Sequence, residues 1–170
     1  SDLKAMNRSY TRESYLEKVK KIREKMPDIA LTSDVIVGFP TETNEDFEET
    51  LTLVNEVRFD NLFTFIFSPR RGTRAEKMEP VLDDESIQHN FDRLLELQNR
   101  ISREINDTYA GRELNVLIDG ESRTDKTVLQ GRTDSNKVVN IKGDRSLIGK
   151  VVRVRITNVR TWSLRGEIIE

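Results

Sequence analysis

The spacing of apolar residues changes near residue 111, and this change constrains the fold more than any other feature. Before it, stretches with helical spacing alternate with short apolar runs; after it, apolar residues recur at every second position between glycines. With 170 residues, the chain has room for one ordinary domain or two small ones. The sequence therefore predicts an α/β part followed by a small all-β barrel.

The first part predicts an alternation of helices and parallel strands. Tyr15, Val19, Ile22 and Met26 recur at helical spacing, and Thr11 is suited to cap that helix. Both strands are apolar on both of their faces, as is typical of parallel strands covered by helices, with a right-handed crossover between them. The predicted helices cover 12–26, 43–57 and 83–107, and the strands cover 31–37 and 62–67.

Two parallel strands are too few for a stable sheet, so we expect further strands outside this chain. The chain also begins at Ser1 without a methionine. We therefore expect it to be a fragment of a longer protein.

The second part predicts five short strands separated by glycines and polar turns. Five strands in about 60 residues are typical of a small barrel of the OB type. The expected division is 1–108 and 109–170, at the end of the long helix. The strands are predicted at 113–119, 127–133, 137–141, 150–157 and 163–169.

Charge is distributed unevenly between the two parts. Residues 109–170 carry a net charge of +4, whereas residues 1–108 carry −6. A basic barrel beside an acidic body is typical of a polyanion-binding module, although two ordinary solvated surfaces would give the same imbalance.

Several classes of site are disfavoured by composition. The chain has no cysteine, so disulfides and thiolate-bound metals are excluded within it, and with His89 as its one histidine we expect no metal site. We find neither a secretory signal nor an apolar run long enough for a membrane span, and we predict a cytoplasmic protein. No nucleophile with a matched base is apparent, so we predict no catalytic residue.

Two loops at the ends of the predicted parallel strands are candidate sites. In "SDVIVGFPTET", Gly38 and Pro40 end the strand just before a helix start, where backbone N–H groups favour an anion or polar group. An ordinary strand-to-helix connection explains the same residues. The second loop, "FSPRRGTRAEK", places Arg70, Arg71 and Arg74 around a glycine turn, which suits phosphate contacts or a solvated basic loop.

The barrel carries the candidate RNA-binding residues. Arg153 and Arg155 share one face of a strand, and the single tryptophan, Trp162, lies near further basic residues. Basic side chains beside an aromatic ring are typical of single-stranded or looped RNA sites, whereas a tryptophan buried in the barrel core is the alternative. The full candidate set in the barrel is Arg132, Asn136, Lys137, Arg153, Arg155, Trp162 and Arg165.

Four consecutive blocks resemble the C-terminal half of the radical S-adenosylmethionine (SAM) methylthiotransferases. They are "MNRSYTRESYLEKVKKIRE", "TSDVIVGFPTETNEDFEETL", "FTFIFSPRRGTRA" and "GRTDSNKVVNIKGD…LIGK…TWSLRGE". The resemblance covers essentially the whole chain. It implies the C-terminal part of a partial TIM-like radical-SAM barrel over 1–108 and a TRAM domain, an OB-like barrel, over 109–170.

The resemblance also implies cofactors and site residues. The full-length enzymes use SAM and two 4Fe–4S clusters, whose cysteines would lie upstream of this chain, so the chain alone should bind neither cluster and be inactive. Gly38 and Glu42 match the family's strand-end motif beside SAM, and we expect Val37, Phe67 and Ser68 to accompany them. Thr41 and Arg71 depart from the family's usual glycine and proline.

The implied partner is the anticodon stem-loop of tRNA, bound by the TRAM domain. The block "GRTDSNKVV" favours members that add a 2-methylthio group to N6-isopentenyl (dimethylallyl) adenosine next to the anticodon. Open alternatives are members acting on a ribosomal-protein aspartate or on threonylcarbamoyl-adenosine, and a non-catalytic RNA-binding TRAM module. We expect a monomer without membrane contact, and a protein reductant for the full-length enzyme.

Overall fold

The computed structural model describes residues 11–169, which form two compact units. The first holds the chain up to Pro27 and Leu31–Asn99; the second holds Asp28–Ala30 and the chain from Arg100 onward. Of the helices within the described range, none is both long and apolar enough to cross a bilayer.

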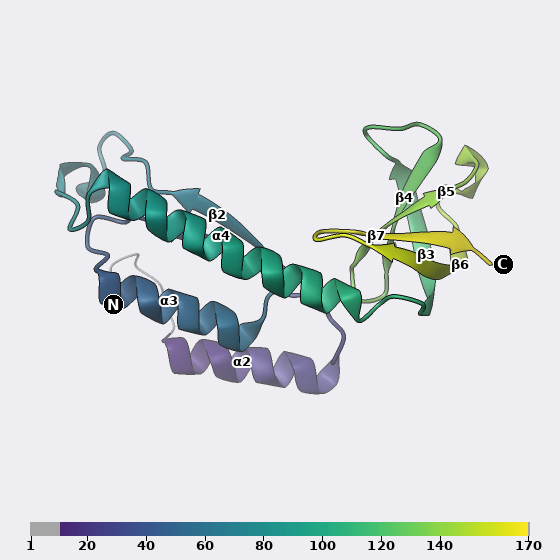
Figure 1. Cartoon of the computed structure of the whole chain (residues 1–170), viewed down its shortest axis with the longest axis horizontal. Helices are drawn as coiled ribbons and strands as arrows, with labels where there is room; N and C mark the ends of the chain where they lie inside the picture. Colours follow the sequence, from purple (N-terminus) through teal and green to yellow (C-terminus); the bar gives the residue numbers. More distant parts are fainter. Residues whose placement is uncertain (1–10, 170) are drawn as a thin grey trace. The chain divides into compact units, whose positions relative to one another are not determined.

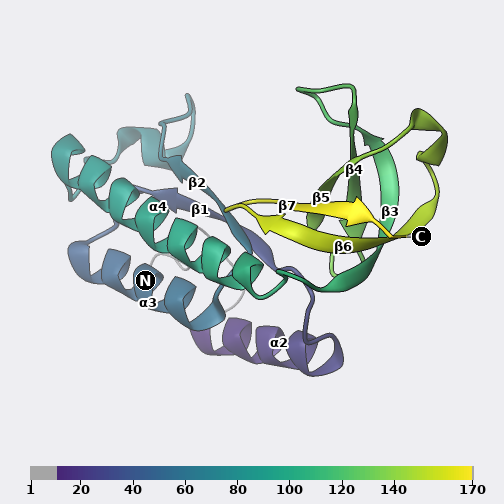
Figure 2. The same cartoon turned by 45° about the vertical axis from the view of Figure 1, so that its right-hand side comes forward.

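The first unit is a two-stranded parallel sheet with helices on one face. Strand β1 pairs with β2 so that Val37 lies opposite Ile66, and α3 and α4 lie over the sheet with α2 beside α3 (Figures 1 and 2). The elements are α2 (Arg12–Lys25), β1 (Thr32–Val37), α3 (Asn44–Val57), β2 (Asn61–Ile66), the short 3-10 helix η1 (Arg74–Lys77) and α4 (Asp84–Asp107).

The first two helices begin where the sequence predicts, because each has a capping box. Thr11 accepts a hydrogen bond from the backbone N–H of Ser14, whose hydroxyl accepts one from the N–H of Thr11. Thr43 and Asp46 make the equivalent pair of bonds at the start of α3. Each box satisfies two groups that would otherwise lack intrahelical partners.

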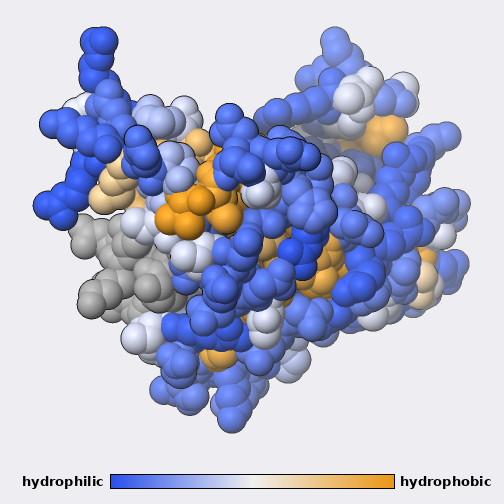
Figure 3. Space-filling model, turned by 60° about the vertical axis from the view of Figure 1, so that its left-hand side comes forward, coloured by the Kyte–Doolittle hydropathy of each residue, from blue (hydrophilic) through white to orange (hydrophobic). Residues whose placement is uncertain are grey.

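The core of the first unit lies between α3, α4 and one face of the sheet. Phe47, Val54 and Leu94 are at most 1% exposed. The expectation that both sheet faces are buried is wrong for the described residues, because Phe63 and Phe65 are 51% and 55% exposed on the face that carries no helix. Apolar side chains of this kind form small patches on a mostly hydrophilic surface (Figure 3).

The second unit contains a closed five-stranded barrel, as predicted. Its strand order is β3-β4-β5-β7-β6, with β6 pairing back onto β3 and with β5 and β7 parallel. This is the strand order of an OB-type barrel. The strands are β3 (Glu113–Glu121), β4 (Val128–Thr133), β5 (Val138–Lys142), β6 (Val151–Val159) and β7 (Leu164–Ile168), with the short 3-10 helix η2 (Arg145–Leu147) before β6.

The barrel core continues into the end of helix α4. The strands alternate buried and outward residues, and the buried set includes Val116, Leu129, Ile141 and Val154. Ile105 of α4 packs against this core. The last turns of α4 therefore belong to the barrel unit, and the two units divide between Asn99 and Arg100. The predicted boundary at 108–109 lies instead where the helix ends and the strands begin.

Gly38 ends β1 in a conformation that other residues rarely adopt. Its φ is +84°, and a Cβ atom built on it would lie 2.8 Å from Cγ2 of Ile87 on α4. Both the backbone conformation and the packing of α4 therefore require glycine here.

We expect Gly38→Ala to lower the free energy of unfolding of the first unit by about 2–4 kcal/mol, through backbone strain and the clash with Ile87. Gly72→Ala is the matched control: its φ is +83° and nothing lies within 4 Å of the added Cβ. It should cost only about 1 kcal/mol. Urea unfolding followed by helical circular dichroism measures both, and equal costs would contradict a role for Ile87.

Candidate functional site

The first candidate corner brings together four of the five residues predicted to face a cofactor. The backbone N–H of Gly38 donates to Oε1 of Glu42 over 3.1 Å, and the N–H of Phe67 donates to the carbonyl of Val37 over 2.7 Å. The ring of Phe67 meets that of Phe39 edge-on at 5.2 Å between centroids. The fifth residue, Ser68, is exposed just beyond β2.

The corner has one buried acidic group. Glu42 is 3% exposed, and its carboxylate accepts the hydrogen bond from the backbone N–H of Gly38. A carboxylate at the carboxyl end of parallel strands accepts hydrogen bonds from ammonium or hydroxyl groups, so the acceptor at this corner fits SAM. Iron–sulfur clusters do not fit this chain, because it has no cysteine to ligate them.

The second candidate corner is a basic loop exposed to solvent. Arg70, Arg71 and Arg74 are all exposed, and no ion pair joins them to an acid within the described residues. The loop is ordered by its own polar groups: Thr73 donates to the carbonyl of Arg70, and the N–H of Gly72 donates to Glu76 over 2.7 Å. The corner could therefore contact phosphates.

Three of the predicted barrel arginines have partners on neighbouring strands. Arg155 pairs with Glu113 at 2.8 Å and Arg153 donates to Oδ1 of Asn115 at 3.2 Å, each across the β3–β6 ladder. Arg132 lies 3.8 Å from a carboxylate oxygen of Asp119 and donates to Oδ1 of Asn136, which has a φ of +70°. Neighbouring groups therefore compensate part of the positive charge on this side of the barrel.

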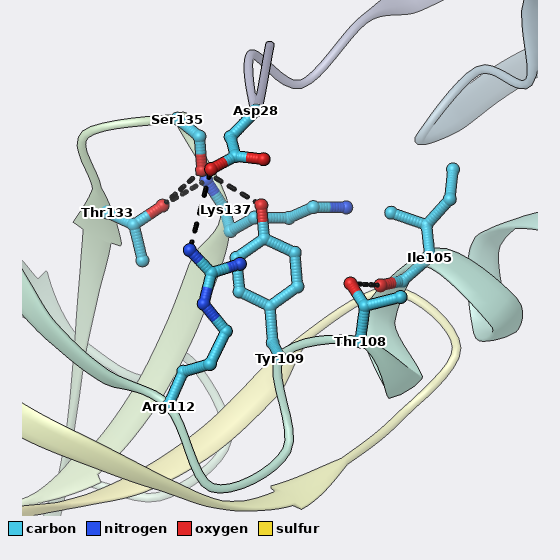
Figure 4. Close-up of polar contacts among 8 residues, drawn as sticks. All are labelled: Asp28, Ile105, Thr108, Tyr109, Arg112, Thr133, Ser135 and Lys137. Carbon is cyan, nitrogen blue, oxygen red and sulfur yellow. Dashed lines mark hydrogen bonds and ion pairs between the residues drawn. The ribbon is translucent and has the colours of Figure 1, made fainter.

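The prediction that Lys137 binds RNA needs a correction. Lys137 is 7% exposed, its ammonium donates to Oδ1 of Asn106 over 2.9 Å, and it lies 5.7 Å from the ring centroid of Tyr109. Figure 4 shows its extended side chain passing Tyr109. Because its ammonium is bonded to Asn106 inside the protein, we assign Lys137 a structural position.

Polar contacts around Lys137 also connect residues 28–30 to the barrel unit. Ser135 hydrogen-bonds the hydroxyls of Thr133 and Tyr109 at 3.0 and 3.2 Å (Figure 4). Its carbonyl accepts a hydrogen bond from the N–H of Ala30. Arg112 lies over the ring of Tyr109 and reaches the carboxylate of Asp28 at 3.5 Å.

Trp162 lies at the surface and not in the barrel core. Its side chain is 62% exposed in the loop 160–163, between β6 and β7. Arg165 follows on β7, where the strand register places it beside Asn140 of β5, which pairs in turn with Gln130 of β4. An exposed ring beside outward amide and guanidinium groups can stack on a base and bind its edges.

The loop between β3 and β4 contributes an acid and two basic residues. The pKa of Asp125 lies below its usual value, chiefly because the Thr127 hydroxyl donates to it over 2.7 Å and also because of the backbone N–H of Thr127 and the charges of Lys142 and Arg165. Arg123 and Lys126 of the same loop are exposed. Asp125 therefore offsets part of the positive charge of Lys142 and Arg165.

Sequence reasoning missed Asn106 and Asp125. Asn106 reads as one polar residue in the last turn of a helix, and nothing local marks it as a partner of Lys137. Asp125 could have been found from "TDKT", because an aspartate two residues before a threonine is typical of an Asx-type turn. Within residues 11–169, no group of three or more His, Asp or Glu is placed to hold a metal ion.

Comparison with known proteins matches both parts of the chain. The TRAM domain model matches residues 107–169, and the Radical SAM superfamily model matches residues 3–54. A tRNA-2-methylthio-N(6)-dimethylallyladenosine synthase from Acetivibrio thermocellus is 56% identical over 98% of this chain and 35% of the relative. Proteins of the same name from Alkaliphilus oremlandii and Bacillus cytotoxicus are 53% and 51% identical over 99% of this chain.

The chain spans about one third of the length of the curated relatives that it matches. The match nevertheless extends across both units and includes the strand-end corner and the barrel. The chain therefore belongs to the radical-SAM methylthiotransferase family, with a TRAM domain at residues 107–169.

Proposed function

We propose that this chain is part of a tRNA methylthiotransferase that adds a 2-methylthio group to N6-dimethylallyladenosine next to the anticodon. The observation that carries this proposal is the identity of 56% across nearly the whole chain to a synthase named for that product. Such an enzyme works where tRNA is found, so we propose a cytoplasmic location. We further propose that the chain is monomeric and that the longer enzyme takes electrons from a reductant protein.

We propose that SAM and two 4Fe–4S clusters serve the longer enzyme, where they would supply one-electron and methyl-transfer chemistry. In this chain, we propose that the strand-end corner faces SAM, with Glu42 as a hydrogen-bond acceptor and the backbone around Gly38 as one wall. Its buried carboxylate and its place at the carboxyl ends of β1 and β2 support this proposal. The proposed corner comprises Val37, Gly38, Glu42, Phe67 and Ser68.

We propose that the radical-SAM part ends at 108 and that the TRAM barrel from 109 binds the anticodon stem-loop. The start of the TRAM match at 107 supports this division. OB-type barrels bind oligonucleotides on their second and third strands and adjoining loops, which here are β4, β5 and the loops 122–127 and 160–163. The exposed Trp162 in the loop 160–163 and Arg165, which lies beside Asn140 of β5, support the same face.

The other predicted residues have secondary places in this proposal. The paired arginines Arg132, Arg153 and Arg155, with Asn136, could add phosphate contacts by exchanging their partners. The exposed corner of Arg70, Arg71 and Arg74 could do so without such an exchange.

Salt dependence tests the RNA proposal. We expect the 170-residue chain to bind a labelled anticodon stem-loop, with log K falling linearly with log salt because phosphate contacts release counterions. Three contacts would weaken binding about 20-fold between 50 and 200 mM salt. Fluorescence anisotropy of the RNA measures this, and affinity independent of salt, or no binding, would contradict the proposal.

Substitution of Trp162 separates stacking from folding. We expect Trp162→Ala to change the free energy of unfolding by less than about 0.5 kcal/mol because the side chain is exposed. It should weaken RNA binding by about 5-fold or more, because stacking on a base is worth roughly 1–3 kcal/mol. Val151→Ala is the matched control, since Val151 is 64% exposed at the start of β6. Equal RNA affinity for the two variants would rule out stacking by Trp162.

Removal of the acid at Asp125 should strengthen RNA binding. Asp125→Asn keeps an acceptor for Thr127 and removes the negative charge that interacts with Lys142 and Arg165. We expect the dissociation constant to fall about 2- to 5-fold, the scale of an exposed charge pair. Glu96→Gln, on the exposed side of α4, changes the net charge equally. If both variants gain the same affinity, the effect comes from net charge and not from this face.

A further inference from the structure

The loop that carries Trp162 is held by one side chain from helix α4. The amide nitrogen of Asn106 donates to the carbonyls of Arg160 and Thr161, over 2.8 and 3.0 Å. The N–H of Arg160 donates to the carbonyl of Ser163 over 2.9 Å and closes the loop on itself. The two residues immediately before Trp162 are therefore both attached to Asn106.

The other end of the same amide is bonded to Lys137. Its Oδ1 accepts from the Lys137 ammonium over 2.9 Å, and Asn106 and Lys137 are 2% and 7% exposed. An ammonium group only donates, so it can face only the oxygen of the amide. Lys137 therefore determines which way the Asn106 amide points and turns its NH2 group toward the two loop carbonyls.

Reversal of this amide would be costly. It would place Oδ1 against the carbonyls of Arg160 and Thr161 and the NH2 group against the ammonium, leaving the buried side chains of Asn106 and Lys137 without suitable partners. The buried pair thus selects one geometry of the loop 160–163.

We propose that Lys137 and Asn106 are positioning residues that hold the loop 160–163 and so present Trp162 for stacking. Neither residue needs to contact RNA, because the effect passes from ammonium to amide to loop carbonyls. Only the last step, presentation of the ring to RNA, rests on the proposed function. Positioning of the loop by the pair is independent of any ligand.

The single tryptophan makes the loop directly observable, because all indole fluorescence of the chain comes from Trp162. Asn106→Asp keeps an acceptor for Lys137 and replaces the donor to both loop carbonyls with an oxygen. Lys137→Met keeps an apolar side chain beside Tyr109. It removes the ammonium group that fixes the orientation of the Asn106 amide. Asn55→Ala, an exposed amide on α3, is the matched control.

We expect the nanosecond depolarisation amplitude of Trp162 to rise about 2-fold in Asn106→Asp and less in Lys137→Met, because freed loops move on this timescale. The control should match the parent chain. Circular dichroism verifies folding, and if Asn106→Asp does not fold, Lys137→Met decides. Unchanged depolarisation in the folded variants would overturn positioning of the loop by the pair.

RNA affinity distinguishes this inference from the proposed function. With a labelled anticodon stem-loop, we expect both folded variants to bind about 3- to 10-fold more weakly, part of the stacking contribution. If the variants show greater depolarisation of Trp162 but bind RNA as tightly as the parent chain, the proposal that the pair presents the Trp162 ring to RNA is overturned. If the parent chain itself binds no RNA, the proposed function fails, whereas the depolarisation result still decides whether the pair positions the loop.

Discussion

A buried ammonium group needs acceptors around it, and the second unit is organised around this requirement. Lys137 comes from the turn between β4 and β5, and Asn106, which accepts a hydrogen bond from its ammonium, comes from the last turn of α4. The burial of both residues ties a helix end to a barrel turn 31 positions away in sequence. This bond adds to the packing of Ile105 against the barrel core, and the last turns of α4 group with the barrel. Loss of either partner would leave the other poorly satisfied, which is the more costly event for buried polar groups.

Periodicity and capping signals predicted the elements well. The apolar spacing of Tyr15, Val19 and Ile22 indicated helix α2, and Thr11 indicated where it starts. Alternation located the barrel strands, because outward and buried residues alternate along most of their length. These features are local, and local geometry determines them.

Features that depend on neighbours distant in sequence were not predictable. Lys137 and Arg132 read alike as basic residues beside a turn, yet one is buried against Asn106 and the other is outward beside Asp119. The partner of Arg155 is Glu113, 42 positions away, and only the register of β3 against β6 brings them together. The candidate strand-end corner was located correctly as a structural corner, although its glycine is explained by Ile87 of α4, a contact that no local pattern reveals.

The two units differ in whether their strands have unpaired edges. In the barrel, each of the five strands has a hydrogen-bonded neighbour on both sides, so its backbone offers no free edge for another strand to join. Within the described part of the chain, β1 and β2 pair only with each other, and Phe63 and Phe65 of β2 are exposed on the face that carries no helix. Edge-to-edge aggregation of this chain would therefore begin at the two-stranded sheet, and a longer protein that covers those edges would remove that hazard.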